Sequence, residues 1–442
     1  MMTTTMRRIT GLTSLALLGL LAAPEFLIAQ APGARAAVPF TLEDAYREAR
    51  SRNPMLRAAG AMTDAAAARE ASAGLPPDPM LQLGIMNFSV PGLETNMPTS
   101  MAPSIQAMQM LPLFGKLGLS GRIADQNTAI ARSGAEERWW EVRSRTAMAF
   151  YMIYETDRKL AVMRETFRLL QDFEKVAKAM YSAGEGRQSD VLRAGVEVVR
   201  MEAEIRRMEA MGTSAAARLN GLLDRPAATP IASPSFGELP LDVPAADTLR
   251  AWAEATRPML ESGRLGVAQA GTRADLVRKD IWPDPVIGFE YGQRGGAMGT
   301  ERMGSAMIGF SIPIFAKSRQ LRMRDEAAAM QAMANAELAD MRAQVDARVG
   351  ELLAELDRTR TLLGLYKSEI LPQARANVQA SFSSYRVGSV DFMTLVDAQM
   401  TVNEYEQEVY ALMAEYGLSV AELEMTIGRE LPRSSQMLAE AR

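Results

Sequence analysis

The sequence contains the stretch Leu111-Pro112-Leu113-Phe114-Gly115-Lys116, and a close copy of it returns 201 residues later, which indicates a duplicated fold. The copy reads Ile312-Pro313-Ile314-Phe315-Ala316-Lys317. Each copy follows a short strand-like segment with glycine and methionine, and each precedes a very long helical segment. We predict that both copies form a hinge between strands and helices. The hinge residues are Pro112, Lys116, Pro313 and Lys317.

Other landmarks recur with offsets between 201 and 206 residues. Pro77-Asp78-Pro79 corresponds to Pro283-Asp284-Pro285, and Tyr181 and Gly184 correspond to Tyr385 and Gly388. Such an offset is far longer than a solenoid repeat, so each repeat is half of one fold. The predicted organisation is a signal peptide over 1–36, a first repeat over 37–225, a proline-rich connector over 226–247, a second repeat over 248–431 and a tail over 432–442.

The composition excludes several classes of function. The chain has 49 basic and 53 acidic residues, a net charge of -4 and no basic block, so a nucleic-acid surface is not expected. It has no cysteine and no histidine, which removes disulfides, thiolate chemistry and imidazole as a base or ligand. It also lacks a nucleophile elbow and a glycine-rich phosphate loop. We therefore predict a protein that is not an enzyme and needs no cofactor.

The N-terminus has the pattern of a secretory signal peptide. Arg7 and Arg8 precede an apolar run, and small residues follow up to Ala36, where we expect cleavage at that residue or the next. The alternative is a retained membrane anchor, although Pro24 and Glu25 make the run short for a span. No cysteine lies near the cleavage site, so no lipid anchor is expected. Any later contact with a membrane would have to use strands.

Two pairs of strands are predicted, within hairpins at about 80–111 and about 286–312. In the second, Ile287, Phe289 and Tyr291 alternate with small or polar residues, and we expect Gln293-Arg294-Gly295-Gly296 to form the loop between its strands. This alternation is typical of transmembrane barrel strands, but hairpins on a soluble domain would show it too. Four strands cannot close a barrel, because roughly eight are the observed minimum. Either the sheet edges stay open or several chains share one barrel.

The remaining sequence predicts long helices that pack as coiled coils. A first helix is expected over 42–73, with Thr41 as its N-cap and an interruption at Pro54. No proline occurs between Phe114 and Tyr181, and Val345 to Ile370 carry apolar residues at alternating spacings of four and three. Pro372 should kink its helix about one turn upstream. Ser189 and Asp391 are the expected N-caps of the two returning helices.

The chain resembles the TolC family of outer-membrane efflux channels. The resemblance lies in the duplicated hairpin and hinge, in Glu369-Ile370-Leu371-Pro372-Gln373-Ala374, and in Tyr385-Arg386-Val387-Gly388 with Leu395-Val396-Asp397-Ala398-Gln399. It implies a mainly α fold with membrane β-hairpins: a homotrimer with a twelve-stranded β-barrel in the outer membrane of a Gram-negative bacterium and a helical barrel across the periplasm. A dimer of eight strands is the alternative. The implied function is a passive conduit of a tripartite system with a periplasmic adaptor and an inner-membrane pump of the RND type.

The resemblance also implies a periplasmic aperture that docks the adaptor. The matching positions at the two helical turns are Tyr181, Gly184, Asp190, Tyr385, Arg386, Gly388, Thr394 and Asp397. Thr394 departs from familiar members, which have an acidic residue there, and Asp190 is its partner by repeat. We expect a ring of carboxylates held by tyrosine and arginine hydrogen bonds. Plain capping or solvated carboxylates are the alternative.

Methionine is the unusual residue of the composition. Six of the 31 methionines lie between Met80 and Met110, and thioethers are soft ligands for Cu(I) and Ag(I). This hairpin resembles the heavy-metal branch of the family, which serves copper and silver efflux. The candidate metal ligands are Met86, Met97, Met101, Met108 and Met110. The alternative is packing, since methionine fills irregular apolar surface well.

Three functions therefore remain open. The first is an outer-membrane channel for Cu(I) and Ag(I) or other heavy-metal ions. The second is a multidrug or type I protein-export channel of the same fold. The third is a soluble periplasmic coiled-coil scaffold.

Overall fold

The computed structural model describes residues 40–86, 90–91, 101–237, 240, 242–296, 299–312 and 314–432. Pro39–Arg442 forms one compact unit, which contains all the described helices and strands. The predicted signal peptide lies outside the described residues, as do Met97, Pro313 and residues 433–442 of the tail.

The N-terminal helices begin where local capping chemistry places them. Thr41 and Asp44 form a capping box before α1 (Leu42–Arg52), with the Asp44 N–H donating to the Thr41 hydroxyl at 3.2 Å. Asn53 then caps α2 (Pro54–Ala73), accepting the N–H of Met55 at 2.9 Å. The predicted interruption at Pro54 is confirmed, because proline is tolerated only in the first turn of the new helix.

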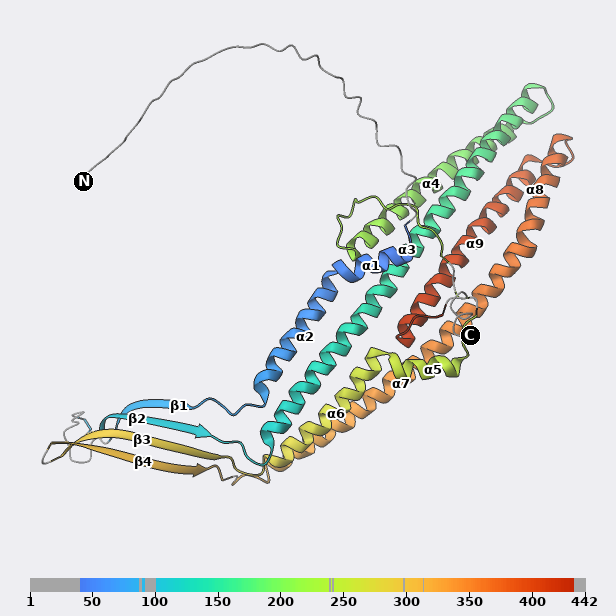
Figure 1. The fold of residues 1–442 in the computed structure, drawn as a ribbon. Coiled ribbons are helices and arrows are strands. Elements are labelled where there is room, and N and C mark those ends of the chain that lie inside the picture. The colour runs from blue at the N-terminus through green and yellow to red at the C-terminus, as the bar shows by residue number, and fades with distance from the viewer. Residues whose placement is uncertain are drawn as a thin grey trace, which may run out of the picture. The chain divides into compact units, whose positions relative to one another are not determined.

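The strands form one antiparallel sheet in the order β1-β2-β3-β4 (Figure 1). Their bounds are β1 (Met80–Met86), β2 (Met101–Met110), β3 (Pro285–Gly296) and β4 (Gly299–Phe310). Adjacent pairing of β2 and β3 joins the two hairpins, which leaves β1 and β4 as the sheet edges. The prediction of the second hairpin loop at 293–296 is wrong. Those residues continue the β3–β4 ladder, where Arg294 forms a salt bridge with Glu301 at 2.6 Å.

The helices that follow the sheet are long, as predicted. They are α3 (Lys116–Ser182), α4 (Gln188–Leu222), α5 (Ala246–Thr256), α6 (Pro258–Lys279), α7 (Gln320–Leu365), a π-helical turn η1 (Tyr366–Ile370), α8 (Leu371–Arg386) and α9 (Phe392–Ile427). The first, α3, alone has 67 residues. Asp391 caps α9 as expected, but the N-cap of α4 is Arg187 and not Ser189.

The predicted coiled-coil seam of α7 is buried in the core. Its members from Val345 to Thr359 are buried, namely Val345, Val349, Leu352, Leu356 and Thr359, and the apolar ones pack against side chains of α5, α6 and α9. The last three members of the predicted seam, Leu363, Tyr366 and Ile370, are only partly buried. The predicted irregularity before Pro372 is present as η1. Because proline lacks an N–H, the carbonyl four residues earlier loses its partner, and a π-turn accommodates the change.

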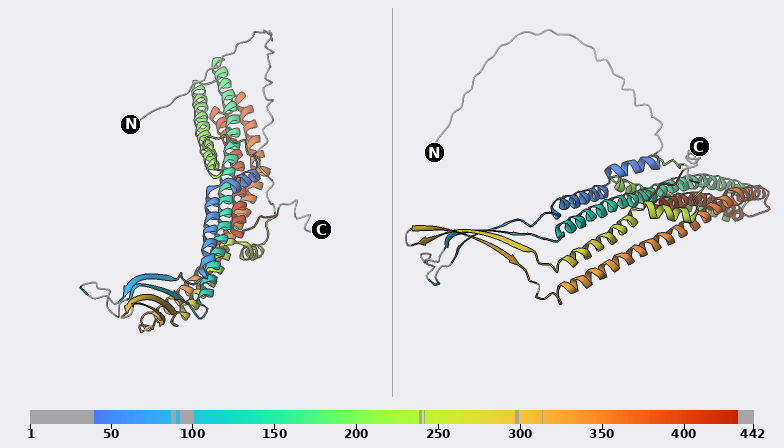
Figure 2. Two further views of the ribbon diagram at one scale, coloured as in Figure 1. Left: turned by 60° about the vertical axis from the view of Figure 1, so that its left-hand side comes forward. Right: turned by 60° about the horizontal axis from the view of Figure 1, so that its bottom comes forward.

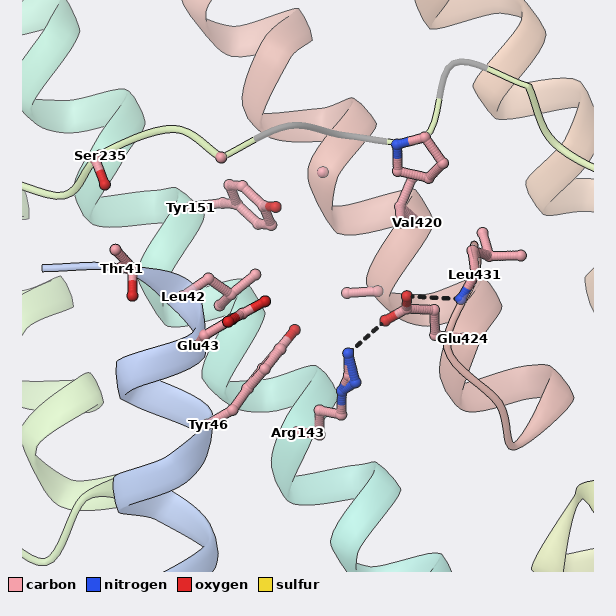
Figure 3. Close-up of a pocket in the computed structure, with 14 residues that line it drawn as sticks. Thr41, Leu42, Glu43, Tyr46, Arg143, Tyr151, Ser235, Val420, Glu424 and Leu431 are labelled. Carbon is pink, nitrogen blue, oxygen red and sulfur yellow. Dashed lines mark hydrogen bonds and ion pairs between the residues drawn. The ribbon is translucent and has the colours of Figure 1, made fainter. Parts of the chain in front are cut away.

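Arg143 of α3 lies at the buried joint between α1, α3 and α9 (Figure 3). Its guanidinium donates to Glu424 at 2.9 Å and to Glu430 at 3.2 Å, and it lies 4.3 Å from the centre of the Tyr46 ring. Glu424 also accepts the N–H of Leu431 at 3.0 Å. Burial raises the pKa of the Tyr46 hydroxyl far above its ordinary value, so the phenol stays neutral. The adjoining cavity of about 260 Å³ is small for a ligand site, and we interpret this region as a structural joint.

The buried pair predicts an asymmetric mutational response. We expect Arg143→Ala to lower the free energy of unfolding by about 3–5 kcal/mol, because Glu424 would remain buried without its cation. The measurement is the thermal unfolding of the detergent-solubilised protein, followed by circular dichroism. The control is Arg138→Ala, since Arg138 pairs with Glu141 on an exposed helix face and should contribute less than about 1 kcal/mol. Equal unfolding midpoints for the two variants would contradict this account.

Candidate functional site

The two turns between long helices share one backbone geometry. Gly184 follows α3 with a φ of 77°, and Gly388 follows α8 with a φ of 72°. Each glycine N–H donates at 3.0 Å to the carbonyl of a tyrosine, Tyr181 in the first turn and Tyr385 in the second. Glycine adopts positive φ without a steric penalty, which explains its presence at both positions. Both turns lie at the end of the helices that is remote from the sheet (Figure 2).

The tyrosines of the two turns differ sharply in environment. Tyr181 is 47% exposed, whereas Tyr385 is 4% exposed. The Tyr385 ring packs edge-on against the Phe392 ring, with the ring centres 5.6 Å apart. Burial raises the pKa of Tyr385, and the charge of Asp190 from the other turn adds to the rise. Asp190 of the first turn therefore lies close enough to Tyr385 of the second for its charge to act on the phenol. The buried hydroxyl of Tyr385 has no hydrogen-bond partner within the described chain.

Thr394 and Asp391 form the N-terminal cap of α9. The Thr394 N–H donates to the Asp391 carboxylate at 2.9 Å, and its hydroxyl donates to the same oxygen at 2.7 Å. These hydrogen bonds lower the pKa of Asp391 below its ordinary value. The threonine at this position therefore serves the cap rather than supplying a charge.

The other predicted aperture residues face solvent in the single chain. Arg386 and Asp397 are exposed, and the structure does not bring them together with Tyr385 into a hydrogen-bonded set. Asp397 lies along a groove between α3, α4 and α9, next to Lys159, Glu197 and Arg200. No pattern in the sequence selects these groove residues, because charges at helical spacing are typical of any solvated face.

The hinge lysine of the first repeat joins the two repeats. Lys116 is buried, and its Nζ donates to the Trp282 carbonyl at 2.8 Å and to the Asp284 carboxylate at 2.9 Å. The other carboxylate oxygen of Asp284 accepts the N–H of Leu113 at 3.2 Å. Lys317, its counterpart in the second repeat, is exposed.

The sheet places several methionines on one face. Met80, Met108, Gly288 and Met307 are consecutive partners in one row across the four strands. A Cβ at Gly288 would lie 2.7 Å from Met307 Cγ and 3.4 Å from Met108 Cγ, so both side chains cover this glycine. Met307 was missed from the sequence. Alternation along β4 gives the face of Met307 within its own strand, but its place beside Met108 follows only from the register between strands.

The other methionines predicted as metal ligands are less concentrated. Met86 and Met101 are opposite each other in the β1–β2 ladder, and Met110 lies opposite Val286. Met97 lies outside the described residues. Among the described residues, no group of three or more acidic side chains could hold a metal ion.

No helix in the described ranges is both long enough and apolar enough to cross a membrane.

Comparisons with known proteins agree on the architecture. Residues 249–429 match the family described as outer membrane efflux protein. The structure is similar to the outer-membrane channel OprN, with a TM-score of 0.74 and 17% identity over 88% of this chain and 89% of that one. The chain has the fold of an outer-membrane efflux channel. CusC is also similar, with a TM-score of 0.77 and 15% identity over 89% of this chain and 93% of that one.

A third similar structure is the outer membrane protein VceC from Vibrio cholerae, with a TM-score of 0.74 and 13% identity over 88% of this chain and 97% of that one. No sequence among the curated proteins matches the chain. The predicted fold class is confirmed, because long helices with a four-stranded antiparallel sheet match these channels. The matched family consists of transport channels and not enzymes, in agreement with the prediction from composition.

The cap of α9 predicts a pH response at the aperture end. A carboxylate whose pKa is lowered in the folded state stabilises that state above its unfolded pKa of 3.8, and this contribution is lost as the pH falls through the lower folded value. We therefore expect the amide protection of the first turn of α9 to fall below pH 3.8. Hydrogen-exchange mass spectrometry would measure it.

The matched control for this pH response is Asp391→Asn, which keeps a capping side chain without a titrating group. Its protection should not change with pH in this window. A parallel loss of protection in the variant and the native protein would assign the response to other carboxylates.

Proposed function

We propose that three copies of this chain form the outer-membrane channel of a tripartite efflux system that exports Cu(I) or Ag(I). The partners would be a periplasmic adaptor at the helical turns and an inner-membrane pump of the RND type. The observation that carries the channel function is the two-faced sheet at one end of the long helices, together with the family match of residues 249–429.

One face of the sheet is suited to lipid. The apolar face, defined by the register, is formed by Leu81, Leu83, Ile85, Ile105, Ile287, Phe289, Tyr291, Ile308 and Phe310. All nine side chains are exposed in the single chain. A continuous exposed apolar patch of this size is costly in water and favours contact with a membrane.

The opposite face is suited to a water-filled lumen. The polar face includes Gln82, Ser104, Gln106, Glu290 and Ser305, which alternate with the apolar face along each strand. Polar side chains on one face and apolar ones on the other match the pattern of a transmembrane barrel strand. This division supports a channel and argues against a soluble scaffold.

The methionine row supports a soft metal ion as cargo. Met80, Met108 and Met307 share the polar face, where packing against lipid would not explain them. Gln106 donates to the sulfur of Met307 at 3.3 Å, and Gln82 donates to that of Met80 at 3.3 Å. Thioethers in a polar lumen would offer transient ligands to Cu(I) or Ag(I). Met97 and Met101 remain candidates on the same chemical ground.

The turns support the aperture role. Asp190 and Tyr385 come from different turns, the Asp190 charge acts on the Tyr385 phenol, and the Tyr385 hydroxyl is buried without a partner in the described chain. A neighbouring copy at the same end would supply a partner for that hydroxyl. Arg386 and Asp397, which are exposed in one chain, would contribute to contacts between copies or with the adaptor.

Loss of the gene should reveal the cargo. We expect a deletion strain to tolerate several-fold less copper and silver than its parent, with tolerance restored by a plasmid copy. The measurement is growth across copper, silver, zinc and a panel of lipophilic drugs. Sensitivity to drugs without sensitivity to the two metals would reject the metal cargo and favour the multidrug alternative.

The methionine row predicts a more specific defect. Met108→Leu combined with Met307→Leu should reduce copper and silver tolerance while the amount of assembled protein in the outer membrane stays unchanged, because leucine keeps the volume and removes the sulfur. The matched control is Met330→Leu with Met333→Leu, which alters two exposed methionines of α7. Unchanged copper and silver tolerance in the strand variant would reject a role of Met108 and Met307 as metal ligands and leave packing as their role.

A further inference from the structure

The two hairpins share one register over five strand pairs. Shifting the first strand by 206 residues and the second by 201 converts the β1–β2 pairs from Met80↔Met108 to Gly84↔Ser104 into β3–β4 pairs, whereas Met86↔Met101 lies beyond a register shift in β1 and does not follow. Met80↔Met108 becomes Val286↔Gly309, and Leu83↔Ile105 becomes Phe289↔Ala306, both of which are observed. The repeat offsets found in the sequence therefore also hold for the three-dimensional pairing of the strands.

The junction between the hairpins is a complete interface within one chain. β2 pairs with β3, and the Leu111 N–H continues the ladder to the Pro285 carbonyl at 2.9 Å. Beyond the ladder, Lys116 reaches across to Asp284. Phe114 packs against Trp282 with ring centres 5.4 Å apart. The end of one repeat is thus fastened to the Pro-Asp-Pro segment at the start of the next strand.

The equivalent groups at the outer edges are exposed. The offsets place Lys317 and Asp78 as the counterparts of Lys116 and Asp284, and neither forms an ion pair with another described residue. Ile312, Ile314 and Phe315 are 78%, 81% and 74% exposed, against 43% for Leu113 in the first repeat.

The backbone between strand and helix also differs between the two repeats. Helix α3 begins at Lys116, whereas α7 begins three residues after Lys317, at Gln320. The Ile314 N–H donates to the Ile312 carbonyl at 2.9 Å, whereas its counterpart Leu113 donates to Asp284. The second junction therefore lacks the contacts that order the first.

We propose that Lys317 of one copy of this chain binds Asp78 of the next copy, as the intermolecular equivalent of the Lys116–Asp284 pair. This inference rests on the proposed assembly of several copies and adds the residues and register of their contact. β4 of one copy pairs with β1 of the next in the register of β2 with β3. The offsets convert Ala107↔Phe289 into Ile308↔Leu83, and Gln109↔Ile287 into Phe310↔Leu81.

The proposed contact between copies differs in two details from the Lys116–Asp284 contact within one chain. Asp280, which lies 3.7 Å from Lys116, has Gly74 as its counterpart, so Lys317 meets one carboxylate and not two. Ala316 stands where Gly115 has a φ of 80°, so the second junction uses another turn. The flexible four-carbon stem of lysine accommodates that change.

Engineered cysteines test the register directly, because the native chain has no cysteine. On oxidation with diamide in isolated outer membranes, a variant with Ile308→Cys and Leu83→Cys should form covalent oligomers that a reductant dissociates. The matched control carries Ile308→Cys and Ile85→Cys, two residues out of register on the same face, and should cross-link far less. Preferential cross-linking of the control pair would overturn the register.

Charge exchange tests the ion pair. Lys317→Asp and Asp78→Lys should each cause loss of the oligomer that resists SDS without heating, and the variant with both changes should regain it. Lys175→Asp, on an exposed face of α3, is the control and should leave the oligomer intact. An unchanged oligomer in both single variants would overturn the ion pair.

The same samples separate this inference from the proposed cargo. Register-specific cross-linking and charge rescue would support the contact even if deletion causes no copper or silver sensitivity. Failure of both tests in a strain that does show complementable metal sensitivity would overturn the contact alone.

Discussion

The structure depends on one constraint, which is that a sheet of four strands cannot satisfy its own edges. β1 and β4 carry unpaired backbone groups along one side each, and one face of the sheet exposes nine large apolar side chains. In a membrane, unpaired edges cost several kcal/mol for each unsatisfied group. Closure with further copies of the same sheet removes both the open edges and the contact of the apolar face with water.

The helices follow from the same duplication. Lys116 and Asp284 fasten the strands of both repeats to the start of α3, so the orientation of the sheet is transmitted to a helix of 67 residues. The coiled-coil seam of α7 and the buried Arg143–Glu424 pair then hold the helices together along their length. The two glycine turns, at Gly184 and Gly388, end the long helices at the end remote from the sheet.

The sequence predicted those features that depend on local periodicity. Alternation located the strands, heptad spacing identified the buried residues of α7, and Pro54 and Pro372 marked the helix interruptions. It failed where tertiary pairing decides. Gly295 and Gly296 suggest a loop at 293–296, but these residues pair with β4 and belong to the sheet. Ser189 is not the N-cap of α4, because the helix already begins at Gln188. The candidate site was predicted only in part for the same reason. The proximity of the Asp190 charge to Tyr385 and the position of Met307 beside Met108 require a register or packing that one sequence does not specify.

If copies of this chain complete one another around a shared barrel, the mass of the assembled particle will reveal it. Native mass spectrometry of the mature protein, extracted from outer membranes in detergent, should give three chains per particle, whose four-stranded sheets together supply twelve strands. A particle that contains a single chain, and remains folded as such, would contradict the account.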